Sequence, residues 1–345
     1  MSALRLLVTG GAGFIGSNFI RLWLERHPDD RVLNLDALTY AGNLANLADL
    51  PDDRRARYRF VRGDIRNQEL VEHLLDEHQI DVIVNFAAES HNSRAVLDPE
   101  AFLRTNVLGT QALLEACRVK GIGRFHHVST CEVYGDLDLA SPEAFREGDA
   151  YRPRTPYNSS KAAADHVVRA YHETFGVPVT ISMCANNYGP FKFPEKVIPL
   201  FTTNALLGKP LPLYRHSENR REWIHANDHC LGIERILERG TVGDTYHIGT
   251  GVEQSVEQIA DSVLDTLGLP RSLKTYVDDR PGHDRRYLLD SSRIRRELAW
   301  EPTIDFGSGV AETIRWYRAH PEWWQPLLEK AAVQETAWKA TGDRR

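Results

Sequence analysis

The first half of the chain alternates short apolar segments with longer segments in which apolar residues recur every three or four positions. The apolar segments predict buried strands at residues 4–9, 31–36, 59–62, 82–86, 125–129 and 179–183. The amphipathic segments predict helices at residues 15–27, 70–78 and 105–120. This alternation is typical of an α/β fold in which a doubly wound parallel sheet is covered by helices on both faces.

The pattern changes near residue 187, where a loop rich in proline, glycine and lysine begins. Short mixed elements follow, with helices predicted at residues 256–267 and 307–319. A strand over 221–225 and a helix over 228–238 indicate that the chain returns to the main sheet. We therefore expect a first domain over 1–187 with an interleaved return near 221–250, a smaller C-terminal α/β lobe over 188–330, and a polar, flexible tail over 331–345.

Composition narrows the classes of function. The chain has 345 residues, of which 42% are hydrophobic and 26% charged, so it is long enough for a large core. Its formal net charge is -6 and its basic residues are scattered, which argues against binding to nucleic acid or to an anionic membrane. No apolar run or signal-peptide pattern suggests a membrane or secreted protein. Cys117, Cys131, Cys184 and Cys230 are widely spaced, as in a cytoplasmic protein, and no metal site is expected.

A glycine-rich turn follows the first predicted strand. Gly10, Gly13 and Gly16 precede the first helix, where glycines let the backbone approach a pyrophosphate at the helix N-terminus. Asp36 ends the second predicted strand, where a carboxylate accepts a hydrogen bond from a ribose 2′-hydroxyl and repels a 2′-phosphate. Asp64, after the third strand, is expected to accept from the adenine amine. This Rossmann-like arrangement predicts NAD as the cofactor, rather than NADP.

Turns after the other predicted strands complete the expected dinucleotide site. Residues 86–90 follow the fourth strand and are expected to line the ribose and the nicotinamide. The expected NAD contacts are Gly10, Gly13, Phe14, Ile15, Gly16, Asp36, Leu38, Thr39, Asp64, Ile65, Phe86, Ala87, Ala88, Ser90, Thr105, Tyr157, Lys161 and Asn187.

Tyr157 and Lys161 are in the frame Tyr-x-x-x-Lys in a predicted helix. They share one helix face, so the ammonium can lie beside the phenol and favour its ionised form. A tyrosinate can take the proton of an alcohol while hydride leaves the same carbon for nicotinamide. Thr130 could hydrogen-bond the same oxygen, and Glu132 is a second candidate base. Cys131, between them, occupies a position where we expect an acid.

The arrangement resembles the extended short-chain dehydrogenase/reductase superfamily from residue 6 to about residue 302. Within it, some segments resemble the dTDP-glucose 4,6-dehydratases, namely residues 36–42 (DALTYAG), 86–91 (FAAESH), 186–199 (NNYGPFKFPEKVIP) and 279–287 (DRPGHDRRY). The resemblance implies internal redox catalysis on a nucleotide sugar, for which dTDP-glucose is the favoured substrate. The implied product is a 4-keto-6-deoxy sugar nucleotide.

The resemblance also implies roles for individual residues. Tyr157 would deprotonate the C4 hydroxyl as hydride passes from C4 to NAD, Glu132 would take the C5 proton, and an acid would protonate the departing C6 hydroxyl. Arginines in the pocket suit a diphosphate because a guanidinium binds two oxygens at once. The implied substrate contacts are Ser90, Thr130, Glu132, Asn186, Lys196, Val197, Pro212, Tyr214, Arg221, His247, Arg280 and His283.

The chain departs from the family's pattern at several positions. The family has Thr-Asp-Glu where this chain has Thr130, Cys131 and Glu132, so the usual acid is missing. One alternative is that the Cys131 thiol, with a reference pKa of ~8.5, donates the proton. A second is that Glu132 serves both as the base at C5 and as the acid at C6. A third is that Cys131 is a packed residue without a chemical role. Residues 92–93 (Asn-Ser) replace Val-Asp, and His247 replaces an asparagine.

These departures leave other functions open. The Thr-Cys-Glu triplet also resembles that of the UDP-N-acetylglucosamine 5,6-dehydratases, which return hydride to C4 and leave a 5,6-alkene. A C5 or C4 epimerase would use Cys131 and Glu132 on opposite faces of the same 4-keto intermediate. A catalytically inactive sugar-nucleotide-binding protein is the hypothesis from another class.

Two predicted helices suggest a second copy of the chain as partner. Residues 105–120 and 157–175 carry apolar side chains on more than one face. In the superfamily that the chain resembles, such a pair packs against its copy in a two-fold four-helix bundle, which implies a homodimer. The expected partners are therefore a nucleotide sugar and a second copy, with no nucleic acid and no membrane.

Overall fold

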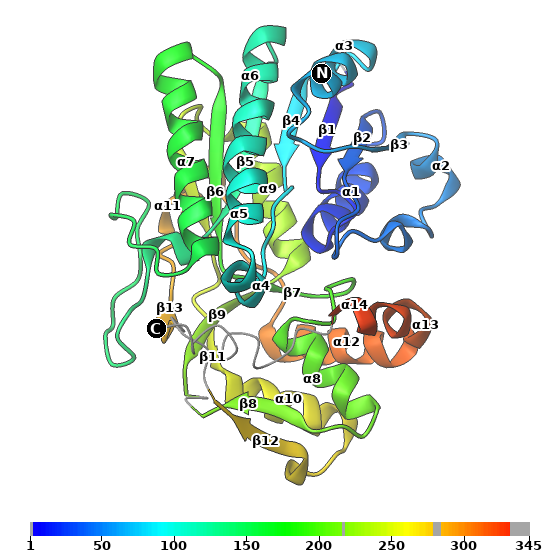
Figure 1. Ribbon diagram of the computed structural model, residues 1–345, viewed down its shortest axis with the longest axis vertical. Coiled ribbons are helices and arrows are strands. Elements are labelled where there is room, and N and C mark those ends of the chain that lie inside the picture. The colour runs from blue at the N-terminus through cyan, green and yellow to red at the C-terminus, as the bar shows by residue number, and fades with distance from the viewer. Residues whose placement is uncertain (1–2, 216–217, 279–283, 332–345) are drawn as a thin grey trace.

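The computed structural model describes residues 3–215, 218–278 and 284–331. Within these residues, a sheet of seven parallel strands forms the centre of the larger part, in the order β10-β6-β5-β4-β1-β2-β3 (Figure 1). The strands are β1 (Arg5–Thr9), β2 (Arg31–Asp36), β3 (Tyr58–Arg62), β4 (Val82–Asn85), β5 (Arg124–Thr130), β6 (Val179–Cys184) and β10 (Thr245–Ile248).

Helices cover both faces of this sheet. One face carries α3 (Gln68–Glu77), α6 (Thr110–Lys120) and α7 (Pro156–Phe175), and the other carries α1 (Phe14–Arg26), α9 (Ala226–Arg239) and α11 (Ser292–Leu298). Successive strand residues point to opposite faces, so Leu7 packs with the first set of helices while Leu6 and Val8 pack with the second. All three are fully buried. The predicted doubly wound α/β fold is confirmed.

Shorter elements connect the strands and helices of the larger part. They are the 3-10 turn Leu44–Leu47, α2 (Asp52–Arg55), α4 (Asn92–Leu97), α5 (Pro99–Phe102), the π-helical segment Leu103–Gly109 and the 3-10 turn Cys131–Tyr134. None of the helices in the described ranges combines the length and apolar character that a membrane crossing requires.

The helix predicted over 105–120 begins earlier and differs in its first part. α5 runs into the π-helical segment Leu103–Gly109, which continues as α6. At Gly109 an added Cβ would lie 2.5 Å from Cδ1 of Ile65. The glycine therefore lets the π-helical segment pack close to the loop after β3. The helical period of the sequence did not indicate this contact.

A smaller lobe lies at the carboxyl ends of the main strands (Figure 1). Its strands are β7 (Asn186–Tyr188), β8 (Leu211–Tyr214), β9 (Arg220–His225), β11 (Glu253–Ser255), β12 (Lys274–Val277) and β13 (Arg286–Tyr287). Its helices and turns are α8 (Val197–Leu206), α10 (Val256–Leu267), the 3-10 turn Arg271–Leu273, α12 (Phe306–Ala319), α13 (Pro321–Trp324), the 3-10 turn Gln325–Leu327 and α14 (Leu328–Ala331). Ile198, Phe201, Trp223, Ile259 and Ile314 are buried together in its core.

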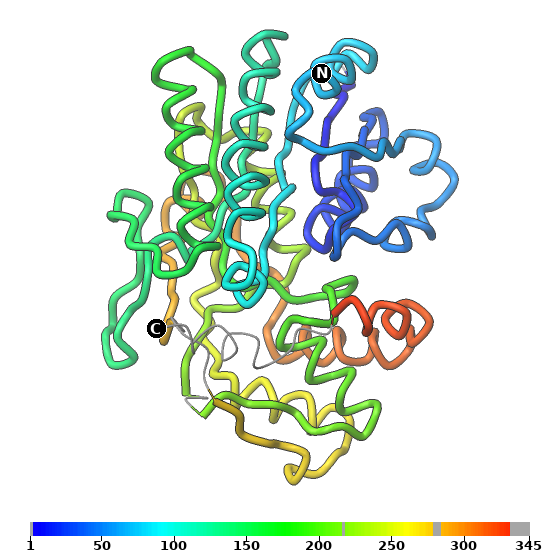
Figure 2. The backbone as a smooth tube through the Cα atoms, in the orientation of Figure 1, coloured from blue at the N-terminus to red at the C-terminus, as the bar shows by residue number. Residues whose placement is uncertain are grey.

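The chain passes between the two parts more than once, which Figure 2 lets the reader follow. The strand predicted over 221–225 is present as β9, but it lies between β11 and β13 in the smaller lobe, not in the main sheet. The strand that returns to the main sheet is β10, which pairs in parallel with β6. The predicted helix over 228–238 lies within α9, which packs against α1. Strand pairing is decided by distant partners, so the periodicity of the segment could not assign β9 to a sheet.

Candidate active site

A cavity of about 320 Å³ opens at the carboxyl ends of the parallel strands, beside the smaller lobe. In open α/β sheets this is where ligands bind. The cavity brings together most of the residues that the sequence predicted. These are Gly10, Gly13, Phe14, Ile15, Gly16, Asp36, Thr39, Asp64, Ile65, Phe86, Ala87, Ala88, Ser90, Thr105, Thr130, Cys131, Glu132, Tyr157, Lys161, Asn186, Asn187 and Lys196.

The glycine turn forms one wall of this cavity. The backbone N–H of Gly10, whose φ is +67°, donates to the Leu35 carbonyl at 2.9 Å, and Gly13 N–H donates to the Gly10 carbonyl at 3.1 Å. A Cβ at Gly16 would lie 2.5 Å from the Gly10 carbonyl oxygen. α1 begins at Phe14, directly after Gly13, so the turn presents the N–H groups of a helix N-terminus along the cavity.

Asp36 is held in place by backbone groups at the end of β2. Its Oδ2 accepts from Ala12 N–H at 2.9 Å and its Oδ1 accepts from Leu38 N–H at 2.8 Å. Burial raises the pKa of Asp36, and the two hydrogen bonds oppose that shift. Leu38 is not among the described residues that line the cavity. It contributes through its backbone N–H, which orients Asp36. Asp64 lines the cavity and is paired with Arg66 at 2.6 Å.

The catalytic candidates come from the end of β5 and from the first turns of α7. The Thr130 hydroxyl accepts from Glu132 N–H at 3.3 Å and so starts the 3-10 turn that presents Cys131 and Glu132. Thr155 caps α7 by accepting from Asn158 N–H at 3.2 Å, which sets the position of Tyr157 in the first turn. A capped 3-10 turn and the capped start of a long helix therefore hold the candidate bases.

Lys161 belongs to a buried network behind the cavity. Its ammonium donates to the Val128 carbonyl at 2.8 Å and lies 3.3 Å from Nε2 of His127. His127 in turn lies 3.4 Å from Oδ1 of Asp165 and contacts the Asn85 amide at 3.2 Å. Burial lowers the pKa of His127 to about 4, so this ring is neutral at physiological pH. Burial also lowers the pKa of Lys161, and the Asp165 charge opposes that shift.

The pKa of Tyr157 differs from the expectation. The sequence predicted an ionised phenol favoured by Lys161, but burial raises the pKa of Tyr157 well above its ordinary value, and the Glu132 charge adds to the shift. A hydrogen bond with Thr130 opposes it. The physical reason is that the phenol is removed from water, while the Lys161 ammonium donates to the carbonyl of Val128 in β5.

Cys131 is buried at the edge of the cavity, with 2% of its surface exposed. Burial raises its pKa well above the ordinary value for a thiol, and the charge of Glu132 adds to the shift. The thiol is therefore protonated and is a weaker acid than an exposed cysteine. Cys184 also lines the cavity, and burial raises the pKa of Cys184 to about 12.

Some predicted substrate contacts lie away from this cavity. Arg221 packs over the Tyr287 ring, and carbonyl oxygens of Asp284 and Arg285 accept from its guanidinium, so its donors are used within the smaller lobe. Val197 begins α8, while Pro212 and Tyr214 lie in β8. None of these four is among the described residues that line the cavity. Arg280 and His283 lie outside the described residues.

His247, predicted as a substrate contact, is also not among the described residues that line the cavity. It lies in β10, is fully buried, and its Nε2 hydrogen-bonds to the Tyr134 hydroxyl at 2.7 Å. Burial lowers the pKa of His247 to about 4. The main-sheet strand β10 turns this side chain into the core.

The sequence analysis missed several lining or neighbouring residues, among them Lys192 and Asn92. Lys192 lines the cavity and lies between the rings of Phe14 and Trp223, at 5.7 and 5.6 Å from their centroids. Asn92 donates through its side-chain amide to Glu132 Oε2 at 3.0 Å. Lys192 lies in the segment 186–199 that resembles the dehydratases, and Asn92 is one of the positions that depart from the family pattern. Neither feature predicted the contacts that these residues make.

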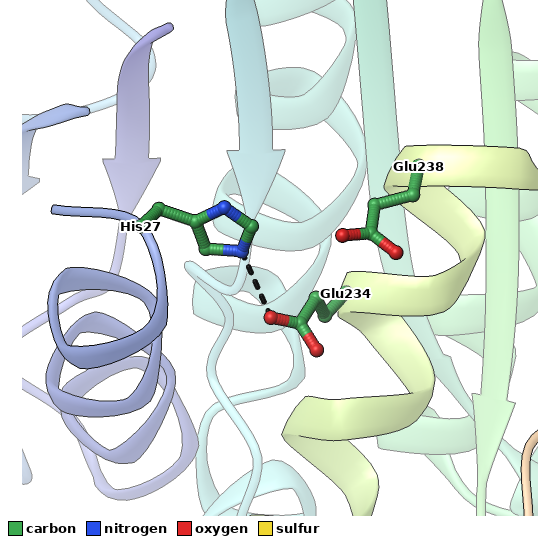
Figure 3. Close-up of side chains that lie close together, drawn as sticks. All are labelled: His27, Glu234 and Glu238. Carbon is green, nitrogen blue, oxygen red and sulfur yellow. Dashed lines mark hydrogen bonds and ion pairs between the residues drawn. The ribbon is translucent and has the colours of Figure 1, made fainter. Parts of the chain in front are cut away.

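His27, Glu234 and Glu238 bring potential metal ligands close together at the contact between α1 and α9 (Figure 3). The buried carboxylate of Glu234 accepts from Arg26 Nε at 2.8 and 3.0 Å and from His27 Nε2 at 2.8 Å. Arg26 already supplies a cation, so the cluster is best described as an ion-pair network that ties the two helices together.

A seven-stranded parallel sheet with a glycine turn and a Thr, Tyr and Lys set at its carboxyl end defines an extended short-chain dehydrogenase/reductase. The family model for GDP-mannose 4,6 dehydratase matches residues 7–313. The dTDP-glucose 4,6-dehydratase of Streptomyces niveus is 46% identical over 329 residues, or 94% of this chain and 96% of that protein. The chain therefore belongs to this sugar-nucleotide 4,6-dehydratase family.

Solved structures agree with this assignment. DesIV, a dTDP-glucose 4,6-dehydratase from Streptomyces venezuelae solved with NAD bound, is 50% identical, with a TM-score of 0.90 over 94% of this chain and 100% of that one. The UDP-glucose 4-epimerase of Thermotoga maritima is 26% identical, with a TM-score of 0.84 over 92% of this chain and 100% of that one. The epimerase shares the fold at much lower identity, so the epimerase alternative is not favoured.

Proposed function

We propose that this chain converts dTDP-glucose to dTDP-4-keto-6-deoxyglucose with bound NAD. The observation that carries the proposal is one cavity that joins the glycine turn to Thr130, Glu132, Tyr157 and Lys161. The similarity to dTDP-glucose 4,6-dehydratases over 94% of the chain supports the substrate.

The residues present fit a dinucleotide. A side chain at Gly16 would fill the space against the Gly10 carbonyl, and the carboxylate of Asp36 is held ready by two backbone N–H groups. The turn over 10–16 would hold the pyrophosphate, and Asp36 the adenosine ribose. When bound, NAD accepts hydride from C4 of the sugar and returns it to C6.

Tyr157, with Thr130 beside it, takes the proton of the C4 hydroxyl. The Lys161 ammonium, one helical turn further on, supplies the nearby positive charge for this step. Glu132 then takes the C5 proton, which the neighbouring ketone has made acidic. These two bases have separate tasks, since Tyr157 acts on oxygen and Glu132 on carbon.

Loss of the C6 hydroxyl requires a proton. The buried thiol of Cys131 is a poor proton donor, because burial raises its pKa. Glu132, in contrast, carries a proton after the C5 step. We therefore assign both roles to Glu132, so that the proton from C5 leaves with the C6 hydroxyl as water. A second proton is added to C5, which offsets the proton that was taken from the C4 hydroxyl. The numbers of protons released and taken up over the whole reaction are therefore equal.

The product identifies the reaction. After incubation of the holoenzyme with dTDP-glucose, NMR should show a 4-ketone and a new C6 methyl group. UDP-glucose under the same conditions serves as the control for the nucleotide and should react more slowly. A 5,6-alkene, an epimer, or no product from either sugar would contradict the proposal.

The chain is also proposed to form a homodimer through α6 and α7. Leu103, Leu108, Val119 and Phe175 lie on or next to these helices with 49%, 57%, 49% and 53% of their surface exposed. Large apolar side chains exposed together favour an interface. Light scattering should show a dimer for the wild type and a monomer for a Leu103→Glu, Leu108→Glu variant, and a monomeric wild type would contradict the proposal.

The cysteines support a reducing compartment, and we propose the cytoplasm. Cys117, Cys131, Cys184 and Cys230 are all buried and unpaired.

A further inference from the structure

Asn92 connects the two halves of the catalytic machinery. Its amide nitrogen donates to Glu132 Oε2 at 3.0 Å, and its amide oxygen accepts from the Thr155 hydroxyl at 2.7 Å. Thr155 is the residue that caps α7, two positions before Tyr157. One side chain at the start of α4 therefore bridges the carboxylate on the turn after β5 and the end of the helix that carries Tyr157.

The hydrogen bonds define which way the Asn92 amide points. The Thr155 hydroxyl oxygen already accepts from Asn158 N–H, so its own proton is directed to an acceptor, the Asn92 oxygen. The NH₂ group is then on the side of Glu132, where an ionised carboxylate needs a donor. The three side chains form a consistent chain in which each donor meets an acceptor.

We propose that Asn92 is a positioning residue that holds the carboxylate of Glu132 for proton removal at C5. The inference rests on the proposed function, because it assigns Glu132 to that step. Proton transfer from carbon is sensitive to the placement of the base, and a shift of about 1 Å can cost on the order of 10²-fold in rate. A hydrogen bond from an amide also favours the charged form of a carboxylate, which is the form that acts as a base.

The experiment separates the C5 step from the C4 step in the holoenzyme. Formation of NADH in a single turnover with dTDP-glucose reports oxidation at C4, and exchange of the C5 proton with deuterated water, followed by mass spectrometry, reports the action of Glu132. For Asn92→Val, we expect the C5 exchange to fall by about tenfold or more while NADH formation changes by less than about twofold. Asn204→Val is the matched control, because the Asn204 amide donates to the Pro210 carbonyl at 3.0 Å and Asn204 is not among the described residues that line the cavity, so both rates should stay near those of the wild type.

Asn92→Asp gives a second readout that a merely structural role would not produce. The side chain keeps its shape and its bond to Thr155 but places a second carboxylate beside Glu132. Like charges disfavour ionisation, so the acid limb of the pH profile for C5 exchange should move upward by about one unit. Even if Asn92→Val folds poorly, this near-isosteric variant still tests the inference.

The contrary results distinguish a failure of this inference from a failure of the proposed function. If C5 exchange in Asn92→Val equals that of the wild type, or falls in the same proportion as NADH formation, Asn92 does not position Glu132. An unshifted pH profile in Asn92→Asp has the same consequence. If the wild type itself shows no C5 exchange, the proposed function fails, and the result is recognisable because it appears before any substitution is made.

Discussion

The two walls of the cavity are built by different means. The glycine wall, residues 10–16 with Asp36, is held by backbone N–H groups that donate to carbonyl oxygens and to the Asp36 carboxylate. The catalytic wall, Thr130 to Glu132 with Tyr157 and Lys161, is held by side-chain bonds that join β4, β5, α4 and α7. In the turn over 10–16 a substitution therefore acts mainly through the collision of its Cβ, while in the catalytic wall each substitution also acts through its neighbours.

The largest expected effect falls on the catalytic wall. Tyr157→Phe removes the proposed base for the C4 hydroxyl, and kcat should fall by about 10³-fold. Steady-state assays of ketone formation check this. Tyr171→Phe, on the same helix but hydrogen-bonded to Gln111 instead, is the control and should leave kcat within about twofold. Undiminished turnover by Tyr157→Phe would refute the proposed chemistry.

The glycine wall should fail for a steric reason. A Cβ in Gly16→Ala lies 2.5 Å from the Gly10 carbonyl oxygen, so the turn must shift and NAD affinity should drop by about 100-fold. Calorimetric titration of protein stripped of dinucleotide measures this. Gly148→Ala is the matched control, because a Cβ there meets no atom within 4 Å. Equal affinity for both variants would show that the turn does not hold the cofactor.

Cys131 offers a gain of function within the catalytic wall. Cys131→Asp supplies a carboxylic acid where the thiol is a weak hydrogen-bond donor, and dehydration should become faster by about tenfold. The rate of water loss after C4 oxidation is the quantity to measure. Cys131→Ser, of similar size but without an acid, should leave the rate unchanged. Loss of a distinct activity in Cys131→Asp would indicate that the thiol has chemistry of its own.

The smallest effect concerns a charge at the edge of the glycine wall. Burial and the charge of Lys196 lower the pKa of Lys192 to about 7, while Cys184 acts in the opposite direction. Lys192 is therefore charged below that pH and becomes neutral above it. Because a cation favours an anionic pyrophosphate, NAD affinity should fall by about threefold from about pH 6 to about pH 8. In Lys192→Met, calorimetric titration should show that NAD affinity depends less on pH. If the pH dependence of NAD affinity is the same as in the wild type, Lys192 is not its source.

Much of the fold could be predicted because the signals are local. Apolar runs and helical periods locate strands such as 31–36 and helices such as 256–267, and spacing locates the glycines and the Tyr-x-x-x-Lys pair. The errors occur where partners are distant. β9 was expected in the main sheet, but β10 is the strand that pairs there with β6.

The sequence by itself determined the class of fold, the place of the glycine turn and the types of candidate catalytic side chain, because each depends on residues close together in the chain. Only the tertiary structure decided what those side chains touch. The Lys161 ammonium donates to the Val128 carbonyl, burial raises the pKa of Tyr157, and Asn92 bridges Glu132 to the cap of α7. These outcomes depend on desolvation and on hydrogen bonds between distant segments, which exist only after the segments have packed together.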